Sequence, residues 1–200
     1  VLHLWASVAS VPLGGVLVAL ADGGRPRLAM LIFSVGITAM LGVSAVTHSR
    51  DWGIESVETL VRLDHTAIFV MFATTPTPIA MLALDDPVAT WLLAVAWFGA
   101  GIGIIAEWIP LHPPAGVVNG IYLVFGWSMI VFTPWMVSAL SPGQAALLFG
   151  GGAAYTVGAV VVGARWPDPW TDSFGYHEIW HVFVVIGCGC HVVMTTQLAL

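Results

Sequence analysis

Residues 28–49 read LAMLIFSVGITAMLGVSAVTHS, a run of 22 residues that contains no Asp, Glu, Lys or Arg. An α-helix rises 1.5 Å per residue, so about 20 apolar residues are enough to cross the hydrocarbon core of a bilayer. The rest of the chain has the same character: of its 200 residues, 58% are hydrophobic and 8% are charged. In ordinary soluble domains about a quarter of the residues are charged. The sequence therefore predicts an integral membrane protein.

Further runs without these four charged residue types occur at 1–21, 65–84, 87–106, 108–164 and 179–200. The run at 108–164 is long enough for two spans, and proline-rich breaks at 112–114 and 141–143 divide it accordingly. We therefore predict an all-α polytopic membrane protein, a bundle of seven transmembrane helices. The expected helices cover residues 4–21, 28–48, 63–84, 88–108, 117–139, 144–164 and 176–198.

Seven such helices leave no room for a separate soluble domain, so residues 1–200 are expected to form a single seven-helix transmembrane domain. The chain begins at Val1 rather than at a methionine, which leaves open an N-terminal segment before it. Pro76, Pro78 and Pro134 fall inside predicted spans and are expected to kink them. Glycine clusters within the spans indicate close packing between helices.

The charge pattern argues against nucleic acid as a partner and leaves membrane lipids as the expected one. Lys is absent, and the five Arg residues are scattered rather than gathered into a basic patch. Arg25 and Arg27 follow the first predicted helix and so lie on the side of the membrane opposite to the N-terminus. The other three Arg residues lie on the same side as the N-terminus. The positive-inside rule then favours a cytoplasmic N-terminus by a single residue.

Ionisable side chains gather at one depth of the predicted bundle. His48 ends the second helix, Asp64 begins the third, and His177 and His181 lie in the first turns of the seventh. The end of the second helix and the starts of the third and seventh all face the same side of the membrane. Because ionisable groups near the hydrocarbon are costly, this cluster is a candidate functional site.

The spacing and type of these residues point to a catalytic zinc site. His177 and His181 are four residues apart and therefore project from one helix face, where they can bind one ion. His48 would supply a third nitrogen and leave a fourth position for water. Asp64 could then accept a proton from the activated water. Ser44, one turn before His48, could orient the water or stabilise a developing oxyanion.

A second interpretation comes from residues 177–181, His-Glu-Ile-Trp-His, which match the H-E-x-x-H pattern of metalloproteases with Glu178 as the base. Such enzymes take a third ligand from downstream of the motif. His191 is ten residues beyond His181, about 15 Å along the same helix, and cannot reach the same ion. A membrane metalloprotease is therefore the less favoured reading.

The remaining polar residues receive simpler interpretations. His191 would line a cavity above the metal or form a core hydrogen bond, and His65 would support the site or face a neighbouring helix. Cys188 and Cys190, two apart on one helix, are not expected to form a disulfide. Interfacial positions are expected for three further residues, His3, Glu107 and His112.

Three segments resemble the hemolysin III family, bacterial relatives of the adiponectin and progestin receptors. They are SAVTH at 44–48, RLDH at 62–65 and FGYHEIWH at 174–181. ATTPTP at 73–78 and GGAAYTVG at 151–158 are also similar to family motifs. With the alkaline ceramidases, these proteins form a superfamily of seven-helix proposed membrane hydrolases. The resemblance covers the second to seventh predicted helices.

The resemblance implies that His48, His177 and His181 bind Zn²⁺, that Asp64 holds the activated water and that Ser44 lies just outside the ligands. It also implies a cytoplasmic N-terminus, with the zinc near the cytoplasmic face of the cell membrane. The expected function is zinc-dependent hydrolysis of a lipid amide or ester. The alternative is a receptor-like or membrane-perturbing, hemolysin-like protein in which zinc is structural.

Overall fold

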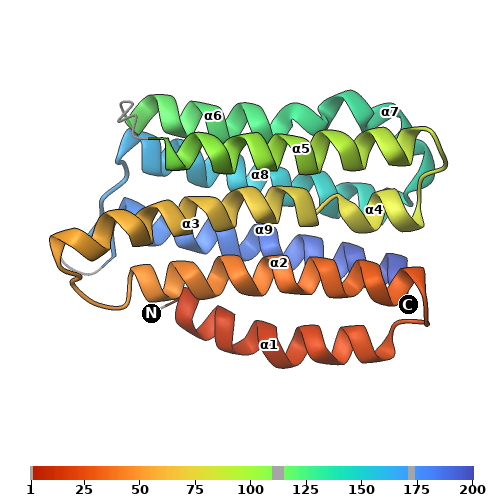
Figure 1. Cartoon of the computed structure of the whole chain (residues 1–200), viewed down its shortest axis with the longest axis horizontal. Coiled ribbons are helices and arrows are strands. Elements are labelled where there is room, and N and C mark those ends of the chain that lie inside the picture. Colours follow the sequence, from red (N-terminus) through yellow and green to blue (C-terminus); the bar gives the residue numbers. More distant parts are fainter. Residues whose placement is uncertain (1, 110–114, 171–173) are drawn as a thin grey trace.

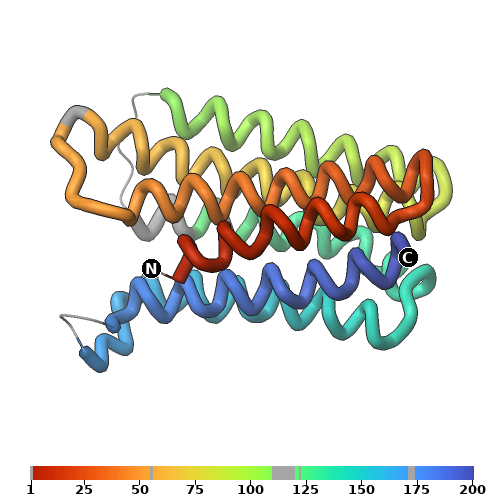
Figure 2. The backbone as a smooth tube through the Cα atoms, turned by 90° about the horizontal axis from the view of Figure 1, so that it is seen from below, coloured from red at the N-terminus to blue at the C-terminus, as the bar shows by residue number. Residues whose placement is uncertain are grey.

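The chain folds into an all-α bundle whose helices run along one common axis (Figure 1). The computed structural model describes residues 2–109, 115–170 and 174–200. The two termini lie at opposite ends of the bundle (Figures 1 and 2). Opposite ends are what an odd number of crossings produces, in agreement with the seven predicted spans.

Within the described residues, six helical segments are long and apolar enough to cross a membrane. A helix satisfies its own backbone hydrogen bonds, which is what a segment surrounded by lipid requires. The segments are α1 (Leu2–Leu20), α2 (Arg25–Thr47), α3 (Ile54–Thr74) continued by α4 (Thr77–Leu82), α5 (Val88–Trp108), α8 (Pro142–Ala164) and α9 (Tyr176–Ala199).

The seventh segment is composite. It consists of α6 (Ala115–Trp127), a 3₁₀ turn η1 (Ser128–Phe132) and α7 (Thr133–Ala139), of which Leu123–Ala139 is a shorter apolar stretch. The prediction of one helix over 117–139 therefore has the right place but misses the break. Pro134 lies in the first turn of α7 and has no backbone N–H to donate, so the regular helix ends before it.

The prolines predicted to kink the third span do interrupt it. The helix stops at Thr74 and resumes at Thr77, with Pro76 and Pro78 at the junction. The hydroxyl of Thr77 donates to the carbonyl of Ala73 over 2.8 Å. This bond satisfies a backbone acceptor at a break that lipid could not solvate.

The start of this span was predicted incorrectly. The helix begins at Ile54 rather than at residue 63, so Asp64 lies well inside α3 rather than at its beginning. The extension carries charge, and Glu58 and Arg62 form an ion pair one turn apart at 2.9 Å. A charge-free run marks the part of a helix that hydrocarbon can surround, and a helix continues beyond it wherever water or headgroups solvate its side chains.

The core lies where α2, α3 and α9 meet, and it contains Phe33, Met40, Met71 and Val184. Large apolar side chains such as Phe98 and Ile102 of α5 remain exposed on the outside. Small residues bring the helices together, as the glycine clusters predicted: a side chain on Gly103 would overlap the ring of Phe69. Apolar surfaces inside and outside fit a protein surrounded by lipid.

The contact between α2 and the end of α3 yields a test of this packing. A Cβ added at Gly36 would lie 2.6 Å from the Cβ of Thr74, which is buried and cannot swing away. We expect Gly36→Ala to lower the free energy of unfolding by about 1–3 kcal/mol, because the helices must separate. Thermal unfolding in detergent, followed by circular dichroism, measures the change.

Gly15→Ala is the matched control, since nothing lies within 4 Å of a side chain added at that exposed position of α1. An equal midpoint of unfolding for Gly36→Ala and Gly15→Ala would contradict the close approach of α2 to α3.

Candidate metal centre

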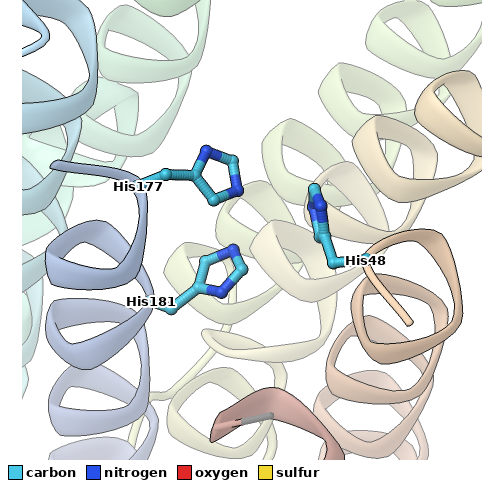
Figure 3. A group of neighbouring side chains, drawn as sticks. All are labelled: His48, His177 and His181. Atoms are coloured by element: carbon cyan, nitrogen blue, oxygen red, sulfur yellow. The ribbon is translucent and has the colours of Figure 1, made fainter. Parts of the chain in front are cut away.

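The end of α2 and the starts of α1 and α9 lie at the same end of the bundle (Figure 1). Three imidazoles converge there. His48 follows the last residue of α2, and His177 and His181 occupy the first two turns of α9. One nitrogen from each ring lies within 4.8 Å of the other two. Figure 3 shows the three rings turned toward one another. The predicted meeting of these three histidines is confirmed.

Local structure explains why His48 places its ring next to those of His177 and His181. Its backbone N–H donates to the carbonyl of Ser44, which closes the last turn of α2. Beside it, the hydroxyl of Thr47 can donate to the carbonyl of Leu60 on α3, at 3.3 Å. The indole of Trp52 donates to the carbonyl of Thr47 over 3.1 Å. These bonds hold the α2–α3 turn and thereby fix the position of His48.

A carboxylate completes the cluster. Asp64 Oδ2 lies 3.5 Å from His48 Nε2, and the side chain of Asp64 is 16% exposed. Its second oxygen, Oδ1, and Nε2 of His177 are both buried without a hydrogen-bond partner among the described residues. Buried polar atoms are rarely left unpaired. A cation bound at the cluster would give such atoms a partner.

The donor set fits Zn²⁺, which binds imidazole nitrogen and carboxylate oxygen in tetrahedral sites. With a Zn–N distance near 2.1 Å, nitrogens on one tetrahedral ion lie about 3.4 Å apart. The ligand nitrogens of the three rings lie within 4.8 Å of one another, so small movements of the side chains would bring them to that spacing. His48, His177 and His181 are the residues that could hold the ion, and Asp64 lies beside them.

Ser44 and His3 extend the cluster toward α1. Both are buried, and Ser44 Oγ lies 2.8 Å from His3 Nδ1. The ring of His3 stacks on that of His181, with the centroids 3.8 Å apart and the planes at 17°. The prediction of an interfacial His3 is wrong, since its exposed fraction is 4%. The sequence did contain information that pointed to the site. The start of the first predicted helix faces the same side of the membrane as the helix ends that carry the other histidines.

A second polar group joins α3 to α5 near the site. His65 Nδ1 lies 2.9 Å from Glu107 Oε1, and Arg62 donates to the backbone carbonyls of Glu107 and Ile109 at the end of α5. His65 therefore faces a neighbouring helix, as expected. Glu107 is not simply interfacial, because its side chain is mostly buried in this contact.

The carboxylate of Glu178, the base in the metalloprotease interpretation, has a backbone partner at the start of α9. Its Oε2 accepts a hydrogen bond from the backbone N–H of Gly175 at 2.9 Å. The carboxylate thereby satisfies a free donor at the start of α9 and carries negative charge where the helix dipole favours it. Its position explains the residue without a catalytic role.

A cavity of about 200 Å³ lies inside the bundle next to this cluster, although His48, His177 and His181 themselves do not line it. Asp64, Ser44 and His3 line it, as does His191, about 15 Å along α9 from His181. His191 Nε2 lies 3.2 Å from the carbonyl of Leu148, its hydrogen-bond acceptor. His191 therefore combines its two predicted roles, a cavity residue and a hydrogen-bonded core residue.

The other sequence predictions concern positions away from the cluster. Cys188 and Cys190 are free thiols, as predicted. His112, expected to be interfacial, lies outside the described residues.

The fold and the cluster define a class: multi-pass helical membrane proteins with a histidine-rich site at one end of the bundle. Comparison with known proteins narrows it, since the family described as Haemolysin-III related matches residues 1–192. A hemolysin-3 homolog of Bacillus subtilis (strain 168) is 31% identical over 78% of this chain and 70% of its own length. Hemolysin-3 of Bacillus cereus is 30% identical over 80% of this chain and 70% of its own. The chain belongs to the haemolysin III family.

Metal content tests the cluster. We expect the purified protein to hold zinc in a one-to-one ratio, and alanine at His48, His177 or His181 to lower that ratio strongly, because each substitution removes one of three nitrogens. Inductively coupled plasma mass spectrometry measures it. His65→Ala is the control, since His65 contacts Glu107 instead. Full zinc in all three alanine variants would refute the assignment.

Proposed function

We propose that the protein is a zinc-dependent integral membrane hydrolase that cleaves a lipid amide or ester. One observation carries the proposal: three imidazoles from two distant helices converge beside the carboxylate of Asp64, and that carboxylate lines a largely apolar cavity. Three histidines with an open fourth position are the ligand set of catalytic rather than structural zinc sites.

When bound, Zn²⁺ supplies Lewis acidity, which activates water near neutral pH and polarises the carbonyl of an amide or ester. Asp64 would accept the proton from the attacking water at Oδ1, the oxygen that has no hydrogen-bond partner in the described part of the chain. Its other oxygen lies 3.5 Å from His48, so the carboxylate is held beside the ligand ring. Ser44 lines the same cavity and would orient the water or donate to the substrate oxygen.

The cavity supports a lipid as the substrate class. Its walls beyond Asp64 and Ser44 are mostly apolar and include Met71, Phe72 and Val184. An acyl chain could occupy this space while its amide or ester bond lies at Asp64 and Ser44, next to the histidine cluster. Ceramide-like lipids are suggested by the superfamily relationship, a resemblance of fold that does not by itself define a substrate.

The proposal includes an orientation. With a cytoplasmic N-terminus, which the distribution of Arg favours by one residue, the cluster would lie near the cytoplasmic face of the cell membrane. Substrates would then reach the site from the inner leaflet.

The competing function is a receptor-like or membrane-perturbing protein with structural zinc. The name of the Bacillus cereus relative, hemolysin-3, gives this alternative its basis. In that case a protein group would close the fourth position, and Asp64 is the nearest candidate.

Asp64→Asn separates the two functions. We expect the variant to keep its zinc, because the three imidazoles remain, and to lose hydrolysis by about 10²–10⁴-fold, because an amide cannot accept the proton. Zinc content and release of fatty acid from a panel of lipid amides and esters in detergent micelles are the measurements. Zinc that is bound without turnover on any lipid, together with lysis of erythrocytes by the wild-type protein, would favour the alternative.

Glu178→Gln tests the hypothesis that Glu178 is the catalytic base, as in a metalloprotease. The amide oxygen of Gln can still accept from Gly175, so zinc and lipid hydrolysis should remain close to wild type, with a slight loss of stability at the start of α9. A loss of activity as large as that of Asp64→Asn would instead identify Glu178 as the base.

A further inference from the structure

His3 is the fourth imidazole at the cluster, and it comes from a different helix. α1 contacts both α2 and α9, and His3 lies at the start of α1, where those two helices bring their histidines together. Its ring touches both partners. One face of the ring stacks on His181 of α9, and Nδ1 forms a hydrogen bond with the hydroxyl of Ser44 on α2.

The geometry of the stack excludes His3 as a further ligand of the same ion. The planes of His3 and His181 differ by only 17°, and their centroids are 3.8 Å apart. Two stacked rings direct their in-plane lone pairs along parallel layers rather than at one point. His177 and His48, in contrast, are tilted against His181 by 65° and 60°, as rings around a shared ion are.

Packing alone does not explain a histidine at this position. His3 Nε2 is buried and has no hydrogen-bond partner among the described residues, and burying an unpaired polar atom is unfavourable. A phenylalanine would fill the space without that penalty. What phenylalanine could not do is bond to Ser44.

We propose that His3 is a positioning residue of the metal site: its ring fixes the orientation of His181, and its Nδ1 fixes the hydroxyl of Ser44. The proposal rests on the metal site proposed above. It makes α1 part of the functional site, although α1 supplies none of the three converging ligands. Groups that orient a metal ligand typically change metal affinity by 10–100-fold when they are replaced.

Two substitutions of similar volume separate the two contacts. His3→Leu fills the space but provides neither a stacking ring nor a hydrogen bond, whereas His3→Phe restores the ring alone. We expect the zinc dissociation constant, measured by competition with a chelator, to rise about 10–100-fold in His3→Leu and much less in His3→Phe. The visible spectrum of the Co²⁺-substituted protein should change in His3→Leu and resemble wild type in His3→Phe.

The bond to Ser44 has its own readout. His3→Phe frees the hydroxyl of Ser44, whereas Ser44→Ala removes it, so His3→Phe should lower kcat by no more than Ser44→Ala does. The double variant should have the same kcat as Ser44→Ala alone. Additive losses would overturn this half of the proposal.

Leu17→Ala is the matched control for a general loosening of α1. Leu17 is buried at the far end of that helix, against Met30 and Ala199. Zinc affinity lost equally in Leu17→Ala and His3→Leu would overturn the proposal, as would wild-type affinity in His3→Leu. Zinc lost as completely in His3→Phe as in His181→Ala would show that His3 is a ligand instead. A wild-type protein that binds no zinc would refute the proposed function itself, whatever the His3 variants do.

Discussion

The structure depends on a constraint that lipid imposes on polar side chains. Imidazoles and carboxylates are costly in hydrocarbon unless they are paired, so they must share one depth and meet there. His48, His177 and His181 satisfy that requirement by lying at helix ends on one side of the bundle. The same requirement accounts for three local features, because each brings a polar group to this level. They are the turn between α2 and α3, the start of α9 and the burial of His3.

The irregular parts of the bundle border the cavity. Thr75 and Pro76, at the break between α3 and α4, line it, and so do Ile130 of η1 and Thr133 at the start of α7. Regular helices pack closely along their whole length. Where two neighbouring segments each lose a turn of regular helix, the walls separate and leave space for a ligand. The prolines that interrupt the spans thus shape the cavity that Asp64 and Ser44 line.

Depth in the membrane could be predicted from the sequence, whereas lateral contacts could not. The helix at 88–108 was predicted to the residue, because Pro87 and the charge at Glu107 mark its limits. Chain parity likewise brought His48, His177 and His181 to one level. The same pattern does not say which helix lies beside which, so the stacking of His3 on His181 was missed. The early start of α3 was missed for another reason: charged residues end a hydrocarbon span without ending a helix.

The claim on which the function rests is that one zinc ion joins the end of α2 to the start of α9. Anomalous diffraction at the zinc absorption edge, from crystals of zinc-replete protein, locates such an ion without reference to activity. We predict a single strong peak among His48, His177 and His181, with each nitrogen about 2.0–2.1 Å from it. No peak at that position, or a peak coordinated by other residues, would contradict the metal site and the hydrolase proposed from it.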